Sequence, residues 1–405
     1  MADATLGAYN IADLREMARR RLPRGMFEFV DRGTEDEVAL ANNRAAFERI
    51  TFRPRILVDV SARSQEITLF GRKVTMPIAV GPTGTAGLLW YQGEIGLARA
   101  AAAAGIPFTV AINSMTSMET IAEQAGGRLW FQLYMWSDRT LSHQIVARAK
   151  AAGFEALMVT VDGAVRANRE YGHRNGFEMP FRFNRRNVAG VLTRPGWLCG
   201  VLLHYAMTSG IPKFENYPPD IMDRLTARTL KSSFLKNDSL TWDSSMAPIE
   251  VLPEILDAVG KRITVMVDSG VRRGADVVKA LALGAQAVLI GRATLYGVAA
   301  GGEAGAARAI TILRDETSRV MAPIGGGMSP HSAANLSSFP LRFLRRAGSA
   351  NRRLRSGALN RASEPFSARR RVRMLEETAV RSCGKETHRP SYGLSFCARQ
   401  ERGNP

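Results

Sequence analysis

The sequence has few cysteines, no long apolar run and no basic leader. Its three cysteines, Cys199, Cys383 and Cys397, are scattered without C-x-x-C spacing, which excludes a disulfide framework and a zinc ribbon and fits a reducing compartment. No uninterrupted apolar stretch reaches the roughly 18 residues that span a bilayer, and residues 1–10 lack the regions of a signal peptide. A cytoplasmic location without a metal site is therefore expected.

Positive charge is concentrated at the C-terminal end. Residues 341–405 hold fifteen Arg and one Lys against five Glu, a net charge of +11 out of +18 for the chain. From Gly325 onward, Gly, Ser, Pro and Arg are abundant and no apolar period is sustained, so residues 325–405 are predicted to form a disordered basic tail. Its Arg pairs could contact nucleic-acid phosphates, but no aromatic platform accompanies them, and nucleic-acid binding is not favoured.

Residues 1–324 alternate short apolar runs with longer helical patterns, after an N-terminal helical segment in which Asn10 is expected to cap residues 11–21. The candidate strands are residues 77–80, 107–111, 129–134, 156–161, 263–268 and 287–290. This alternation predicts parallel strands with right-handed crossovers. Polar and glycine residues follow several of these strands, which favours a β/α barrel over a doubly wound sheet, although both keep their sites at strand ends.

One long segment interrupts the alternation. Residues 166–241 contain no predicted strand and exceed an ordinary βα loop. Within them, residues 188–207 are apolar and aromatic and follow Arg182, Arg185 and Arg186. Two interpretations stay open: residues 182–207 contact a membrane interface, or the segment folds over the barrel mouth.

The last two predicted strands end in glycine and arginine. Gly270 and Gly291 would let backbone N–H groups approach an anion, and Arg272 and Arg292 would add fork-shaped donors. Two such loops after consecutive late strands are the usual phosphate site of a β/α barrel. The alternative is that these arginines pair with carboxylates at the barrel rim.

Several longer motifs point to one family. They are Arg21-Leu-Pro23, Gly33-Thr-Glu-Asp-Glu37, Phe52-Arg-Pro-Arg55, Gly81-Pro-Thr-Gly84, Trp130-Phe-Gln-Leu-Tyr134, Thr160-Val-Asp162, Asp268-Ser-Gly-Val-Arg-Arg-Gly274 and Lys279-Ala-Leu-Ala-Leu-Gly284. On these motifs, residues 10–324 resemble the FMN-dependent 2-hydroxy-acid dehydrogenases, which include glycolate oxidase, L-lactate dehydrogenase and mandelate dehydrogenase. The mandelate dehydrogenase branch is the most similar in appearance. The resemblance implies a TIM-type (β/α)8 barrel over residues 1–324.

The resemblance also implies an activity and a site. It implies FMN as cofactor and oxidation of (S)-2-hydroxy acids, mandelate- or lactate-like, to 2-oxo acids, with a quinone or another electron acceptor. A homo-oligomer and a peripheral position on the cytoplasmic membrane are compatible with it. The implied cofactor-binding residues are Pro82, Thr83, Gly84, Gln132, Thr160, Asp268, Ser269, Gly270, Arg272, Gly291 and Arg292. The implied substrate-binding residues are Tyr134, Arg169 and Phe29.

The chain departs from the family pattern at three places. Phe29 replaces a tyrosine and Ala111 a serine, and each replacement removes a hydroxyl. Near residues 243–247 about two βα units are missing, and with them the catalytic histidine, a second carboxylate-binding arginine and a lysine beside the flavin. No general base is identified, and His173, which follows Arg169, is the only histidine that could replace it. We therefore expect a distorted barrel of low stability with little activity; the alternatives are a non-catalytic FMN-binding remnant and a nucleic-acid binder acting through its tail.

Overall fold

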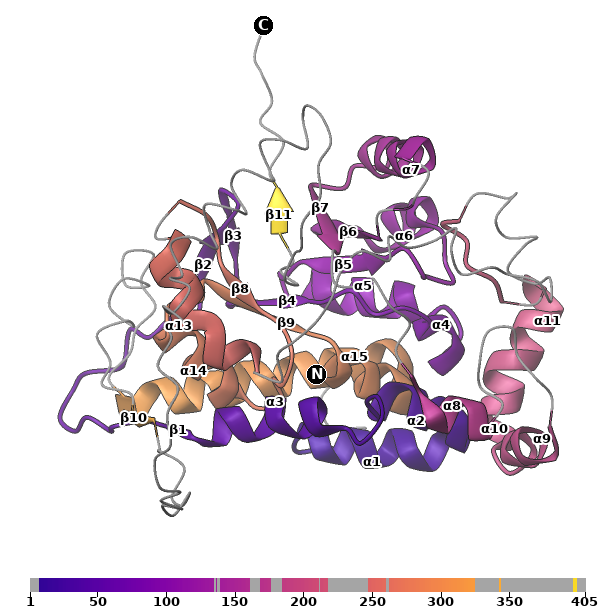
Figure 1. The fold of residues 1–405 in the computed structure, drawn as a ribbon, viewed down its shortest axis with the longest axis horizontal. Helices are drawn as coiled ribbons and strands as arrows, with labels where there is room; N and C mark the ends of the chain where they lie inside the picture. The colour runs from indigo at the N-terminus through magenta and orange to yellow at the C-terminus, as the bar shows by residue number, and fades with distance from the viewer. Residues whose placement is uncertain are drawn as a thin grey trace, which may run out of the picture.

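Six parallel strands form a curved sheet at the centre of the molecule (Figure 1), in the order β7-β6-β5-β4-β9-β8. They are β4 (Ile78–Val80), β5 (Phe108–Ala111), β6 (Leu129–Tyr134), β7 (Ala156–Thr160), β8 (Met266–Val267) and β9 (Ala287–Ile290). The computed structural model describes residues 7–134, 136, 139–160, 168–175, 184–210, 212–217, 247–259 and 262–324, together with two short strands, Arg342–Phe343 and Phe396–Ala398.

The helices follow the expected alternation. After the strands come α4 (Ala86–Leu89), α5 (Gly93–Ala103), α6 (Met118–Ala125), α7 (Arg139–Ala151), α13 (Pro248–Val259), α14 (Gly274–Ala282) and α15 (Arg292–Met321). The N-terminal helices are α1 (Ile11–Arg21), α2 (Arg24–Asp31) and α3 (Val38–Glu48). The long helix α15 packs against both α1 and α5, and Figure 1 shows α1 running beneath it.

The expected N-terminal cap is confirmed. The Asp13 backbone N–H donates to Asn10 Oδ1 at 3.0 Å, and the Asn10 N–H donates to Asp13 Oδ2 at 3.2 Å. This reciprocal pair satisfies two donors that the first helical turn leaves without a partner. The helix begins where the sequence predicts because a short polar side chain at this position can replace the missing intrahelical acceptors.

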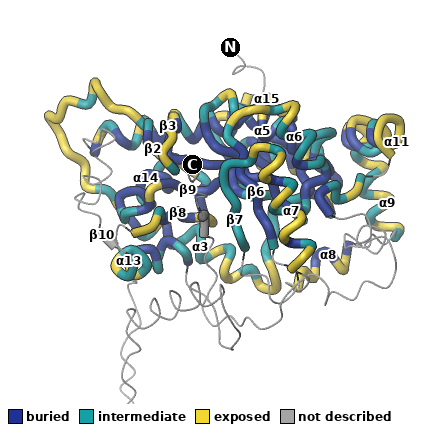
Figure 2. The backbone as a smooth tube through the Cα atoms, turned by 90° about the horizontal axis from the view of Figure 1, so that it is seen from above, coloured by how far each residue is buried: buried dark blue, intermediate teal, exposed yellow. Residues whose placement is uncertain are grey.

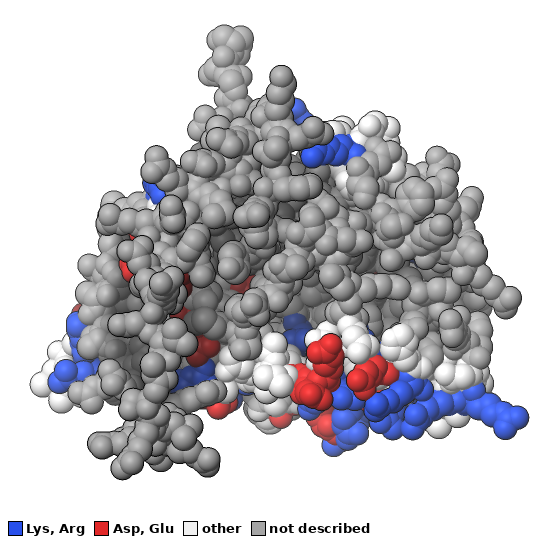
Figure 3. All heavy atoms as spheres, in the orientation of Figure 1, with Lys and Arg blue, Asp and Glu red and all other residues white. Residues whose placement is uncertain are grey.

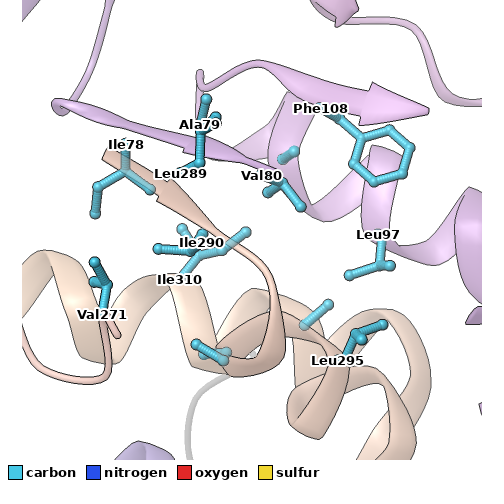
Figure 4. Packing of buried hydrophobic residues seen from close by; sticks show 14 of the residues in the cluster. Ile78, Ala79, Val80, Leu97, Phe108, Val271, Leu289, Ile290, Leu295 and Ile310 are labelled. Carbon is cyan, nitrogen blue, oxygen red and sulfur yellow. The ribbon is translucent and has the colours of Figure 1, made fainter. Parts of the chain in front are cut away.

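The central strands are apolar on both sides, as expected for parallel strands that helices cover. Ile78, Val80, Leu289 and Ile290 are all buried, and Figure 4 shows Ile290 beside Ile310 of α15. Figure 2 shows the same layering, with buried strands inside a partly exposed shell of helices. Parallel strands that are buried on both faces read as continuous apolar runs, which is why their positions could be predicted.

Two expectations about strands need correction. The strand predicted at residues 263–268 is only β8 (Met266–Val267). The short strand β1 (Ile50–Thr51) and the antiparallel hairpin of β2 (Ile67–Leu69) and β3 (Arg72–Val74) were not predicted. These segments have too few apolar positions to be distinguished from loops by their sequence. Only their pairing with other strands identifies them as strands.

The sheet does not close on itself within the described residues. β7 pairs with β6 and β11, whereas β8 pairs with β9, so the described β7 and β8 do not pair with each other. The strand β11 (Phe396–Ala398) lies antiparallel to β7, with Cys397 opposite Met158. The free edge of β7 is thus covered by a segment from the C-terminal end, as an unpaired edge would otherwise expose backbone donors and acceptors.

Most of the described part of the long insertion is helical, whereas residues 212–217 are not. It contains α8 (Glu170–Asn175), α9 (Arg185–Leu192), α10 (Pro195–Trp197), the π-helix η1 (Leu198–Leu203) and α11 (His204–Thr208). The indole N–H of Trp197 donates to the Leu88 carbonyl at 2.7 Å, and Tyr205 Oη accepts the Gln92 N–H at 3.2 Å. These bonds attach α10 and α11 to the side of the barrel beside α4. No helix in the described ranges is both long and apolar enough to cross a membrane.

Candidate functional site

The ends of β4 and β9 bring together the first and last glycine-containing loops of the barrel. The Gly81 N–H donates to the Ile290 carbonyl at 2.9 Å. A Cβ built on Gly291 would lie 3.4 Å from Thr83 Cγ2, so the Thr83 side chain lies directly beside this glycine. Thr83 Oγ1 is buried and has no hydrogen-bond partner among the described residues. A buried hydroxyl without a partner is costly, and a bound group with an acceptor would satisfy it.

A second pair of predicted residues meets at the ends of β6 and β7. Gln132 is 3% exposed, and its amide Nε2 donates to Thr160 Oγ1 at 2.8 Å. Ala111 on β5 lies directly opposite Gln132 in the strand register. Because Tyr134 lies two residues beyond Gln132 on the same strand, the two side chains share a face of the sheet. The structure thus brings Gln132 and Thr160 into contact at one end of the sheet.

Arg272 and Arg292 form the cationic part of the site. The Arg272 guanidinium donates to the Val271 carbonyl at 2.7 Å, and Arg292 donates to the Val30 carbonyl at 3.0 Å. Neither forms an ion pair with a carboxylate in the described part of the chain. Asp276 accepts the backbone N–H of Arg272 at 2.9 Å, but its ion pair is with Arg44. The alternative of rim carboxylates is therefore not found among these residues.

The electrostatics of Arg272 agree with a site for an anion. Burial lowers the pKa of Arg272, and the charges of Arg292 and Arg44 lower it further. Arg292 is also the first residue of α15, whose N-terminal N–H groups favour an anion. A desolvated guanidinium beside another cation is unfavourable until a negative group joins them. A phosphate would supply that group.

The sequence predicts that Gly270 lets backbone N–H groups approach an anion, but the structure gives another reason for a glycine at this position. Gly270 has a φ of +85°, and a Cβ there would meet the backbone oxygen of Asn43 and lie 2.9 Å from Phe47 Cε2. The glycine is therefore required by its left-handed backbone and by the close approach of α3. Ser269, just before it, also has a positive φ, of +81°. Asp268 and Ser269 are exposed at the end of β8.

Two of the three predicted substrate residues, Phe29 and Arg169, lie on α2 and just before α8. The Arg169 guanidinium carbon lies 5.1 Å from the centre of the Phe29 ring. The backbone of Asn168, next to Arg169, accepts the Glu35 N–H at 3.2 Å. Phe29 on α2 and Arg169 before α8 are therefore brought together, as a shared substrate contact requires.

Tyr217 and Asn113 were not identified from the sequence, and they lie at the same end of the sheet as Gly84 and Tyr134. Tyr217 donates its hydroxyl to Asn113 Oδ1 at 2.6 Å, and a Cβ on Gly84 would lie 3.0 Å from Asn113 Cβ. Burial raises the pKa of Tyr217, and Tyr134 raises it further. Residues 212–217 thus return across the strand ends, which agrees with a segment folded over the barrel mouth. Their position depends on tertiary contacts, and the local sequence carries no signal of it.

No histidine is placed as a general base by a described contact. His143 lies on α7, and His204 on α11 stacks on Tyr91 with ring centres 3.8 Å apart. His173 lies on α8, after Arg169. His331 and His388 lie outside the described residues, as does the junction at residues 243–246. The described residues also contain no His, Cys, Asp and Glu group that could hold a metal ion.

Comparisons with known proteins agree with this site. The profile of the FMN-dependent dehydrogenases matches residues 18–244 and 239–331. The chain is 35% identical to (S)-mandelate dehydrogenase of Pseudomonas putida over 364 residues, which covers 78% of this chain and 90% of that protein. It is also 35% identical to a putative L-lactate dehydrogenase of Mycobacterium tuberculosis over 360 residues, with 78% and 86% covered.

A solved structure is similar over the whole of its length. The crystal structure of the monotopic membrane protein (S)-mandelate dehydrogenase superposes with a TM-score of 0.74 at 32% identity, covering 84% of this chain and 100% of that chain. Both comparisons therefore place residues from the N-terminal helices to α15 in one family of folds.

Proposed function

The chain belongs to the FMN-dependent dehydrogenase family, and we propose that it binds FMN at the strand ends and keeps part of a site for 2-hydroxy acids. The relatives include enzymes named for the oxidation of mandelate, lactate and glycolate, so 2-hydroxy-acid oxidation is the activity of the family. The observation that carries the proposal is the pair Arg272 and Arg292, which lie beside the N-terminus of α15 without a carboxylate partner in the described chain.

The residues present fit the cofactor. Arg272, Arg292 and the backbone N–H of Gly291 would hold the phosphate, because hydrogen bonds to a charged group are stronger than hydrogen bonds between two neutral groups. Thr83, whose Cγ2 lies beside Gly291, has a buried hydroxyl without a described partner, and with the backbone of Pro82 and Gly84 it would border the flavin ring.

The other predicted cofactor-binding residues are assigned contacts from their positions at the strand ends. Gln132 and Thr160 would donate to or accept from the ring heteroatoms, and the loop of Asp268, Ser269 and Gly270 would border the ribityl chain. When bound, FMN supplies the acceptor for the two electrons of the oxidation. The protein's own task is then to orient the acid and to remove a proton.

Orientation of the acid is assigned to Tyr134, Arg169 and Phe29. Arg169 would pair with the carboxylate, Tyr134 would donate to the hydroxyl or carboxylate, and the Phe29 ring would pack beside them. A positioned general base adds about 10²–10⁴-fold to a rate. The family resemblance implies that the catalytic histidine is lost with the missing segment near residues 243–247, so we infer that binding is kept and proton removal is impaired.

Two observations support an internal loss near residues 243–247. The family profile matches in two segments that meet at residues 239–244. In the alignment with mandelate dehydrogenase, 78% of 405 residues is about 316, so about 48 of the 364 aligned positions have no residue of this chain. A loss of that length corresponds to about two βα units, which agrees with six parallel strands where such a barrel has eight.

The first test is to purify the full chain with FMN and to record its visible spectrum. We expect retained flavin absorbance, and bleaching by (S)-mandelate or L-lactate under anaerobic conditions at least about 100-fold slower than in an active relative, because the general base is missing. A colourless chain that does not take up added FMN would contradict the binding proposal. Fast bleaching would contradict the inferred loss of proton removal.

We also propose that the chain associates peripherally with a membrane through residues 182–207. In the described part of this segment, Leu192 is 65% exposed and Met207, its last residue, is 78% exposed. Arg185 and Arg186 are exposed nearby on α9. Figure 3 shows basic side chains gathered at the lower right of the molecule, where Figure 1 places α1 and α9. Apolar side chains beside cations are suited to an anionic bilayer surface.

The membrane proposal is tested by sedimentation with vesicles of phosphatidylglycerol and phosphatidylcholine. Replacing Leu192 and Met207 with serine should weaken binding by at least about tenfold, because each apolar side chain contributes on the order of 1.5–3 kcal/mol when buried. The matched control replaces Ile56 and Leu57, which are 84% and 101% exposed in another loop. Equal losses in both variants would argue against a specific membrane-binding segment.

A further inference from the structure

Tyr171 has a buried hydroxyl without an acceptor. This residue of α8 is 6% exposed, and its O–H has no hydrogen-bond acceptor among the described residues, because the Arg169 guanidinium beside it is a donor only. Buried tyrosine hydroxyls usually find an acceptor, because loss of water is otherwise not compensated. A bound group that accepts a hydrogen bond would therefore satisfy this hydroxyl.

Cations surround this hydroxyl. The Arg32 guanidinium carbon lies 5.3 Å from the centre of the Tyr171 ring. Arg169 precedes Tyr171 by two residues, and both Arg169 and Arg292 act on its hydroxyl through their charges. Arg32 is partly neutralised by Glu37, with Nε 3.0 Å from Oε1. Glu28 and Asp31 act on Arg32 and Arg292 through their charges, but Arg169 and Arg292 form no ion pair with a described carboxylate, so both can pair with an anion.

The hydroxyl remains a donor at neutral pH. Burial raises the pKa of Tyr171 above its ordinary value near 10, although the charges of Arg169, Arg292 and Arg32 oppose this rise. The group is thus protonated, and it can donate to a carboxylate without competing for a proton.

Helices α2 and α8 are held against each other at this point. The side-chain amide of Asn175 donates to Glu28, and Arg169 lies over the Phe29 ring. Phe29 and Tyr171 therefore border the same region from the two helices. Phe29 has no hydroxyl, whereas Tyr171 offers one beside the same arginine.

We propose that Tyr171 is a substrate-binding residue whose hydroxyl donates, together with Arg169, to the carboxylate of the bound 2-hydroxy or 2-oxo acid. The inference rests on the proposed site for these acids and adds a donor that the sequence motifs do not include. It also explains how a site with Phe29 in place of a tyrosine, and with one carboxylate-binding arginine lost, can still hold an acid.

The test compares Tyr171→Phe with the unchanged full chain in the presence of excess FMN. Binding of benzoylformate, an aromatic 2-oxo acid that does not reduce flavin, is measured by titration calorimetry, and FMN affinity is measured separately by flavin fluorescence. We expect the Kd for benzoylformate to rise about tenfold, as for a lost hydrogen bond to a charged group, with no change in the Kd for FMN. Tyr9→Phe is the matched control, since Tyr9 is 80% exposed, and it should change neither constant.

A second variant separates a direct contact from a structural effect. Arg169→Met should weaken benzoylformate binding, and Tyr171→Phe in the Arg169→Met background should add less than its tenfold effect, because both donors serve one carboxylate. Unchanged benzoylformate binding in Tyr171→Phe would overturn the inference, and so would no benzoylformate binding by the unchanged chain. Loss of FMN binding from the unchanged chain would instead contradict the proposed cofactor site, because calorimetry reports acid binding with or without flavin.

Discussion

Replacing Gly274 with alanine is expected to destabilise the fold by at least about 3 kcal/mol, which is a large part of the 5–15 kcal/mol that separates a folded domain from its unfolded chain. A Cβ at this position would overlap the backbone of Glu316 and Thr317 and lie 2.6 Å from Glu316 Cβ. The Gly274 N–H also donates to Glu316 Oε2 at 2.8 Å. Backbone atoms cannot move aside as a flexible side chain can, so α14 and α15 would have to separate.

Gly190→Ala is the matched control for this variant. Gly190 lies inside α9, and a Cβ there would have nothing within 4 Å. Since alanine favours a helix by about 1 kcal/mol over glycine, this change should leave stability equal or slightly higher. Urea unfolding followed by circular dichroism measures both. A Gly274→Ala chain as stable as the original would mean that α14 and α15 do not pack at the observed distance.

Replacing Arg272 with methionine should weaken FMN binding by about 10–100-fold and leave the chain without cofactor at least as stable as before. The two effects have one cause. The guanidinium is desolvated, its charge lies near Arg292 and Arg44, and no described carboxylate pairs with it. Without phosphate this charge is a cost, and with phosphate it forms a charge-assisted bond of roughly 1.5–3 kcal/mol.

Arg273→Met is the control because Arg273 is the neighbouring residue with the opposite environment. It is more exposed and pairs with Glu316, with Nε 2.8 Å from Oε1. Its loss should lower stability by roughly 1–3 kcal/mol, because the Glu316 side chain is only 7% exposed and would keep its charge without a cation, and it should leave FMN affinity unchanged. Flavin fluorescence titration and thermal unfolding with and without FMN report both quantities. Equal FMN affinity in the original and Arg272→Met chains would remove Arg272 from the phosphate site.

The elements that could be predicted are those whose pattern is local. Apolar runs such as residues 129–134 and the polar cap at Asn10 act within a few residues, and the structure has both where they were expected. The glycine and arginine loops after β8 and β9 could be named as an anion site because parallel strands bring their ends to one side. The family motifs added the cofactor and the class of substrate.

The short strands and the barrel edges could not be predicted in the same way. Residues 263–268 form a strand only at Met266–Val267, because a strand ends where its neighbour no longer provides partners. Covering of the β7 edge by β11 joins residues more than 200 positions apart in the chain. No local pattern predicts such a pairing, because the entropy cost of closing the loop and the energy gained from the contacts between the two strands depend on the whole chain.

The amino-acid sequence alone thus determined the strand and helix alternation, the cap of α1 and the loops that carry Arg272 and Arg292. Only the tertiary structure decided that Arg272 lacks a carboxylate partner, that Gly270 is required by the approach of Asn43, and that the hydroxyl of Tyr171 is buried among arginines. The physical reason is the distance along the chain over which each effect acts. Periodicity and capping depend on neighbours in the chain, whereas desolvation and charge depend on every group that packing brings near, however distant in sequence.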